Sequence, residues 1–242
     1  MLLAVAAHSS CRAPLPDQVT EGRWVRYHWW ADEEAPCPEA IAEIDHLLDG
    51  LATRFGRPLP ARFRLDYYRL RTVEDLHRIP ECDVPRAGAC AVGNEVFALT
   101  PTQDHEVVHV FMNQRGAPPQ LFMEGIAVVF GCGAARFAGD PLTAVDLLPL
   151  TQRFSWSGDP WTTYQEAADF TRFLIDEHGL EAFTGFYETT PHTAEGAKLD
   201  EAFRAAFGEG LEDALGRWSA RPPGREGESC LALEDQCDGP TA

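Results

Sequence analysis

The stretch His105-Glu106-Val107-Val108-His109 determines how the rest of the chain is interpreted. Its two histidines are four residues apart, so on a helix they lie on one face and both rings can reach a single metal ion. Glu106 lies beside that ion without being needed as a ligand, and a carboxylate there can accept a proton from metal-bound water. The alternative is an ordinary helix that carries two histidines by chance.

A third ligand is available in the apolar stretch that follows. Glu124 lies within Leu121-Phe122-Met123-Glu124-Gly125-Ile126-Ala127-Val128-Val129-Phe130, which predicts a second helix ending near Phe130. Two histidines and one glutamate leave a fourth zinc position for water, which is the pattern of a catalytic rather than a structural site. We therefore expect one Zn²⁺ per chain, bound by His105, His109 and Glu124. Gly125 is expected to let this helix approach its neighbour closely.

The residues before the motif predict where its helix begins. Thr100-Pro101-Thr102-Gln103 has threonine at a capping position, proline at the first helical position and glutamine at the third. A short strand over 94–99 is predicted to lead directly into this helix.

The remaining pattern predicts an α+β fold, with a small N-terminal mixed sheet over the motif helix and a mainly helical C-terminal part. Alternating aromatic residues indicate strands, and apolar residues at helical spacing indicate helices. The expected strands are 23–30 and 62–70, and the expected helices are 38–55, 72–78, 161–178, 180–189, 197–207 and 209–219. Residues 79–93 and 133–160 are expected as loops, the second with a short helix near 141–149.

The motif and its surroundings resemble the gluzincin metallopeptidases, and more narrowly the small bacterial peptidase MA-like domains. The resemblance covers roughly residues 60–220 and is strongest at 104–130 and 160–220. It implies a zincin-like fold, zinc bound by the three ligands named above and Glu106 as general base. It also implies that Tyr164 hydrogen-bonds the developing oxyanion; the alternative is a tyrosine of the core or its rim. In this family the strand before the motif helix often edges the cleft and pairs with an extended peptide. The alternative is that 94–99 is only a core strand, and both can hold.

The sequence departs from the family pattern at two places. Many gluzincins have an acidic residue one turn after the glutamate ligand, which orients a histidine, whereas this chain has Ala127 and Val128 there. Support for the histidines is therefore expected from Asp104, Asp146 or Asp169, or from a backbone carbonyl. The Gly-x-Met-Glu-Asn signature of aminopeptidases is also absent, so an aminopeptidase is not expected.

Composition limits the classes of partner. A chain of 242 residues with 45% hydrophobic residues can bury one good core, and its net charge of −18 argues against binding nucleic acid or anionic lipid by charge. No apolar run is long enough for a transmembrane helix. We expect one peptidase domain over 22–221, preceded by a signal-like segment and linker over 1–21 and followed by a Pro/Gly-rich tail over 222–242. The oligomeric state is left open.

The seven cysteines indicate an oxidising compartment outside the cytoplasm. Cys82 and Cys90 suit a local disulfide, as do Cys230 and Cys237, and Cys37 with Cys132 remains by elimination, although six cysteines allow about 15 pairings. The apolar run before Cys11 resembles the end of a bacterial lipoprotein signal, which implies membrane attachment through a lipidated Cys11. The alternative is a disordered N-terminus with a spare thiol.

These observations predict zinc-dependent hydrolysis of peptide or protein substrates by an endopeptidase outside the cytoplasm, with zinc-bound water activated by Glu106. The alternative is a catalytically silent, zinc-stabilised binding module on the cell surface. A metal-free structural domain has little support, because three ligands are present. The sequence names no substrate or cleavage preference.

Overall fold

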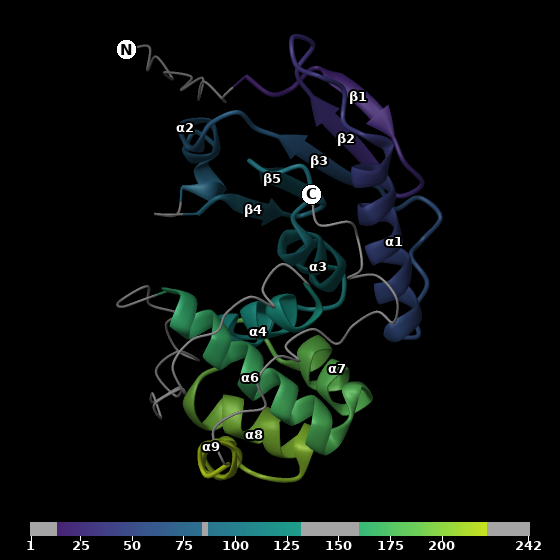
Figure 1. The fold of residues 1–242 in the computed structure, drawn as a ribbon. Coiled ribbons are helices and arrows are strands. Elements are labelled where there is room, and N and C mark those ends of the chain that lie inside the picture. Colours follow the sequence, from purple (N-terminus) through teal and green to yellow (C-terminus); the bar gives the residue numbers. More distant parts are fainter. Residues whose placement is uncertain (1–13, 84–86, 132–159, 222–242) are drawn as a thin grey trace, which may run out of the picture.

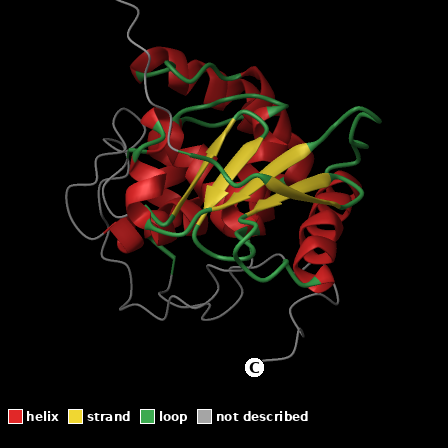
Figure 2. Cartoon of the chain, turned by 90° about the horizontal axis from the view of Figure 1, so that it is seen from above, coloured by secondary structure: helices red, strands yellow, loops and turns green. Residues whose placement is uncertain are grey.

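The computed structural model describes residues 14–83, 87–131 and 160–221, and the fold is α+β as expected. A five-stranded sheet forms one end of the molecule, helices α6 to α9 form the other, and α3 and α4 lie between them (Figure 1). Figure 2 shows the strands passing over the helices. The strands are β1 (Gln18–Glu21), β2 (Val25–Trp29), β3 (Leu65–Arg69), β4 (Ala89–Val92) and β5 (Glu95–Ala98).

Sheet order is β1-β2-β3-β5-β4, with a parallel centre and antiparallel edges. The expected strands over 23–30, 62–70 and 94–99 are confirmed as β2, β3 and β5. Two other expectations are wrong: β1 lies in the expected linker, and β4 lies in the expected loop. For β5 the structure favours the alternative of a core strand: β3 and β4 occupy both of its sides, so it has no free edge for a peptide.

On one face of the sheet, α1 (Pro38–Arg54) packs against β2, and the helix Asp104–Asn113 packs against β4 and β5. The presence of α1 confirms the helix expected from its apolar spacing. Its buried side chains share the main core with the inward residues of β2 and β3, namely Ile41, Ile44, Leu47, Leu48, Leu51, Val25, Tyr27, Leu65 and Tyr67. The opposite face has a smaller apolar cluster beneath α2 (Val73–His77) and the 3-10 helix η1 (Pro80–Cys82). The sheet therefore provides a fixed base for the segment that enters α3.

The helical half is built on close contact between α4 (Gln120–Phe130) and α6 (Pro160–His178). At Gly125, a Cβ atom would lie 2.1 Å from Thr171 Oγ1 and 2.5 Å from the Ala167 carbonyl oxygen, so only glycine fits this crossing. This confirms the expected close approach. The other helices also confirm the predicted segments: α7 (Leu180–Thr189), α8 (Gly196–Phe207) and α9 (Leu211–Ser219).

The start of α3 (Asp104–Asn113) differs from the prediction. Thr100 and Pro101 lie outside the helix, and their carbonyl groups accept hydrogen bonds from the hydroxyls of Tyr67 (2.9 Å) and Tyr27 (3.0 Å). The Thr100 hydroxyl donates to the Thr102 carbonyl and does not cap the helix. The helix therefore begins later than its local start signal predicts, and contacts from the sheet hold the residues before it.

The expected disulfide between Cys82 and Cys90 is present and ties η1 to β4. Cys37 is a free, exposed cysteine in the described part of the chain. Its expected partner Cys132 lies outside the described residues, as do Cys11, Cys230 and Cys237, the tail over 222–242 and the expected helix near 141–149. Among the described residues, no helix has the length and apolar character needed to cross a membrane.

Candidate metal centre

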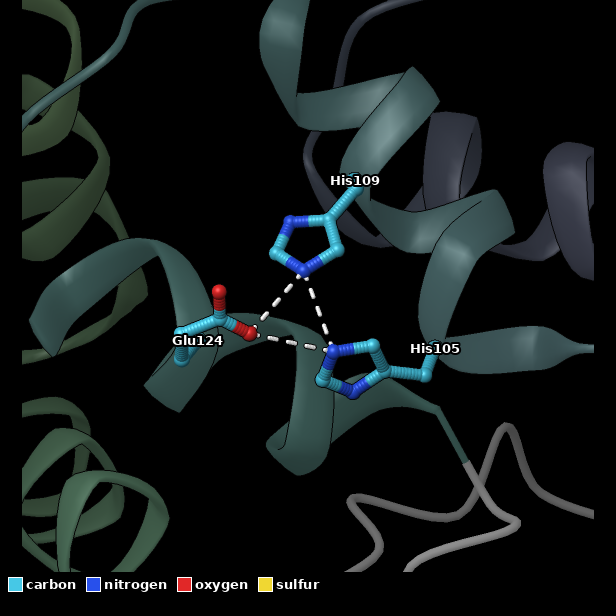
Figure 3. Close-up of side chains that lie close together, drawn as sticks. All are labelled: His105, His109 and Glu124. Atoms are coloured by element: carbon cyan, nitrogen blue, oxygen red, sulfur yellow. Dashed lines mark hydrogen bonds and ion pairs between the residues drawn. The ribbon is translucent and has the colours of Figure 1, made fainter. Parts of the chain in front are cut away.

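Three side chains from two helices point toward one another (Figure 3). His105 and His109 lie one turn apart on α3, and Glu124 comes from the second turn of α4. The Nε2 atoms of the two histidines are 3.0 Å apart, and Glu124 Oε2 lies 3.1 Å from His105 Nε2 and 3.2 Å from His109 Nε2. The motif and the following helix thus bring together all three expected ligands.

The three atoms fit a single small cation. Zinc–nitrogen and zinc–oxygen bonds of about 2.0–2.1 Å in a tetrahedral site place ligand atoms about 3.3–3.4 Å apart. The observed separations of 3.0, 3.1 and 3.2 Å are within a few tenths of an ångström of that value. With both imidazoles neutral at Nε2, two nitrogens and a carboxylate oxygen would each direct a lone pair to the same point, which one cation would satisfy. This group can therefore hold a metal ion.

Burial strengthens the electrostatic interaction of Glu124 with His105 and His109. His109 and Glu124 are each 8% exposed, so a carboxylate sits where an unpaired charge would be costly. Burial alone would raise the pKa of Glu124, but the adjacent His109 and His105 outweigh it and hold that pKa well below its ordinary value. Burial likewise lowers the pKa of His109, and the charge and hydrogen bond of Glu124 raise it overall. The carboxylate is therefore ionised and ready to bind a cation.

Glu106 and Tyr164 lie beside the three candidate ligands. Glu106 is partly buried on the first turn of α3, and its negative charge raises the pKa of both His109 and Tyr164. The Tyr164 ring, from α6, stands at 88° to the His105 ring with centroids 5.6 Å apart. Burial raises the pKa of Tyr164, and the charges of Glu124 and Glu106 raise it further, so the phenol keeps its proton. The expected base and the expected donor are thus both next to the group.

A residue that the sequence analysis did not single out contacts the glutamate ligand. Gln120, one turn before Glu124 on α4, donates from Nε2 to Glu124 Oε1 at 3.3 Å. The two carboxylate oxygens therefore have separate environments: Oε2 faces the histidines, and Oε1 faces the amide. The spacing of four residues on one helix could have indicated this contact.

The expected acidic support of the histidines is wrong for Asp169. Its carboxylate accepts hydrogen bonds from Trp218 Nε1 (2.7 Å) and Arg221 Nη2 (2.9 Å), which ties α6 to α9. Asp104 is adjacent to His105, but its buried Oδ1 has no hydrogen-bond partner among the described residues. Burial raises the pKa of Asp104 to about 6. Asp146 lies outside the described residues.

Comparison with known proteins adds no assignment: no protein-family model and no curated protein matches this sequence.

Proposed function

We propose that the protein is a zinc-dependent peptidase of the gluzincin type, and specifically an endopeptidase. The observation that carries the proposal is the convergence of His105, His109 and Glu124, with Glu106 beside them and not among the ligands. Two imidazoles and one carboxylate are a ligand set that suits Zn²⁺ and leaves a coordination position open. A purely structural zinc site has four protein ligands and no need of a neighbouring base.

The residues around the group have separable tasks in this proposal. When bound, the zinc ion would supply Lewis-acid polarisation and increase the acidity of water. Glu106 would accept a proton from the attacking water and pass it to the leaving amine, as a general base and then a general acid. The protonated phenol of Tyr164 would donate a hydrogen bond to the oxyanion of the tetrahedral intermediate.

The fold is compatible with a zincin-like arrangement. The first two ligands lie on a helix directly beneath a small sheet, the third lies on the next helix, and the chain continues into a helical half. Tyr164 comes from that helical half and approaches the site from the side of α6. A substrate carbonyl would thus meet groups from both halves of the molecule.

We also propose that the protein works outside the cytoplasm. The Cys82–Cys90 disulfide supports this location, because disulfides persist in oxidising compartments. Attachment to a membrane through lipidated Cys11 remains part of the proposal. A peptide or protein is the proposed substrate, and the acidic net charge of −18 makes nucleic acid an unsuitable one.

The proposal is tested by comparing wild type with Glu106→Gln on a peptide library at matched zinc occupancy. The substitution leaves the ligands and nearly the whole shape unchanged, but an amide cannot accept the proton, so cleavage should fall by about 10²–10⁴-fold. Tyr164→Phe should retain zinc and lose about 10²–10³-fold, as for one oxyanion donor. A wild-type protein that binds zinc and cleaves nothing in the library would instead support the catalytically silent binding module.

A further inference from the structure

Two buried tyrosines hold the segment that leads into α3. Tyr27 on β2 and Tyr67 on β3 are register partners in the parallel part of the sheet, and neither is exposed to solvent. Their rings are stacked with centroids 5.0 Å apart and planes at 15°. The Tyr27 hydroxyl donates to the Pro101 carbonyl at 3.0 Å, and the Tyr67 hydroxyl donates to the Thr100 carbonyl at 2.9 Å. The two hydroxyls therefore form hydrogen bonds with two consecutive backbone carbonyl groups.

Those carbonyls would otherwise belong to a longer helix. In a helix, the carbonyl of residue i accepts from the amide of residue i+4, so Thr100 and Pro101 would accept from Asp104 and His105. The local sequence favours that longer helix, with threonine at the cap and proline at the first position. In the structure the first amide of α3 to find a backbone acceptor is that of Glu106, which donates to the Gln103 carbonyl at 3.1 Å. The two hydroxyls thus bond the carbonyls that the longer helix would use.

The other side of this first turn is held by α4. A Cβ atom on Gly131, which follows α4, would lie 2.8 Å from the His105 amide nitrogen and 2.9 Å from its Cα. The first turn of α3 is therefore fixed between the tyrosine pair and the end of α4. Glu106 is in this turn, and its negative charge contributes to raising the pKa of Tyr67.

From these contacts we propose that Tyr27 and Tyr67 are positioning residues: by holding the carbonyls of Pro101 and Thr100, they set where α3 begins and so direct Glu106 at the reacting centre. The catalytic part of this inference rests on the proposed function. The structural part, that the pair determines the helix start, does not.

A shift of the helix start would move the site. An extended residue spans about 3.3 Å and a helical residue about 1.5 Å, so converting three residues before Asp104 to helix would shorten the connection to β5 by at most roughly 5 Å, and by less here because residues 99–101 form a bend. Either the first turn moves toward the sheet or the end of β5 loses its pairing. A displacement of about 1 Å can cost on the order of 10²-fold in rate. Burial raises the pKa of Tyr27 to about 12 and raises the pKa of Tyr67 as well. Both hydroxyls therefore stay protonated, and able to donate, at neutral pH.

The test is the double variant Tyr27→Phe/Tyr67→Phe, which keeps both rings and removes only the hydroxyls. The control is Tyr68→Phe, whose hydroxyl lies 3.4 Å from Glu95 Oε1 on the opposite side of β3. The first readout is the ¹³Cα chemical shift of residues 100–103 in isotopically labelled protein, which requires no activity. We expect helical shifts there in the double variant and wild-type shifts in the control.

The second readout is steady-state peptide cleavage at saturating zinc. We expect kcat to fall by about 10–10²-fold with KM changed by less than about threefold, because Glu106 is misdirected while substrate binding is retained. Should the double variant fail to fold, each single Tyr→Phe variant gives the same two readouts. Unchanged chemical shifts in a folded variant would overturn the inference, as would an equal loss of kcat in Tyr68→Phe. If wild type itself cleaves no peptide, the proposed function fails, and the chemical shifts still decide whether the tyrosines set the helix start.

Discussion

Gly125→Ala provides a test of the packing that sets the glutamate ligand. The added Cβ would lie 2.5 Å from the Ala167 carbonyl oxygen, a backbone atom that no side-chain rotation can move away, and 2.1 Å from Thr171 Oγ1. Ordinary contacts of this kind are about 3.4 Å or longer, so α4 and α6 must separate by roughly 1 Å. Overpacking of this severity costs about 3 kcal/mol, and the better helix propensity of alanine returns about 1 kcal/mol. We therefore expect a net loss of about 2 kcal/mol.

The assay is equilibrium urea unfolding of the metal-free protein, with Gly185→Ala as the matched control. Gly185 also lies inside a helix, α7, but a Cβ there would have no atom within 4 Å. The control should gain about 0.5–1 kcal/mol from propensity alone. The two variants should thus differ by roughly 3 kcal/mol in free energy of unfolding, and zinc affinity should fall only in Gly125→Ala, since Glu124 is its neighbour. Equal gains in both variants would refute the close packing of α4 on α6.

Three further predictions concern single contacts. Gln120→Leu should weaken zinc binding by about 10-fold or more in chelator competition, because Oε1 of Glu124 loses its hydrogen bond. Burial raises the pKa of Glu166 from 4.5 to about 7, so the folded protein holds a proton that the unfolded chain releases. Stability should therefore fall by on the order of 1–3 kcal/mol between those pH values, and Glu166→Gln should remove most of that fall in pH-dependent unfolding. Replacing both Cys82 and Cys90 with alanine should cost roughly 2–3 kcal/mol in thermal unfolding, because the cross-link restricts the unfolded chain.

For each of these three predictions, a control variant or a specific outcome would contradict the reasoning. Gln114→Leu removes an amide that donates to Asn94 Oδ1, away from the ligands, and should leave zinc affinity unchanged. If both glutamine variants weaken zinc binding equally, the Glu124 contact has no special role. A stability curve that keeps the same slope after Glu166→Gln would show that another group titrates there. Free thiols at Cys82 and Cys90 in protein from its native compartment would contradict both the disulfide and the proposed location.

The sequence was sufficient where local pattern and tertiary contact agree. The apolar residues of α1 and α4 recur at helical spacing, and the faces that they form are buried in the fold. Gly125 lies where α4 crosses α6 so closely that a side chain would collide with α6. The edge strands β1 and β4 were missed because each has four residues and little apolar alternation. Their pairing comes from neighbouring strands, which local pattern does not contain.

In the candidate metal site, too, local pattern predicts some of the residues and tertiary structure determines the others. Its three candidate ligands follow from helical spacing within α3 and from the next apolar helix, so a local pattern was enough to predict the group that could hold a metal ion. The supporting contacts depend on tertiary structure: Asp169 is turned toward α9, while Gln120 faces the ligand carboxylate. The local signal predicts the start of α3 too early, and the two tyrosines that bond the segment before it, Tyr27 and Tyr67, lie far away in sequence.

The most direct test of the central claim is the zinc content of purified protein, measured by elemental analysis without added metal. Wild type and Glu106→Gln should each contain about one zinc per chain, because Glu106 is beside the ligands and not one of them. His109→Ala should be nearly empty, since two remaining ligands bind zinc weakly. Full zinc occupancy in His109→Ala, or loss of zinc in a folded Glu106→Gln protein, would contradict the assignment of His105, His109 and Glu124 as the ligands.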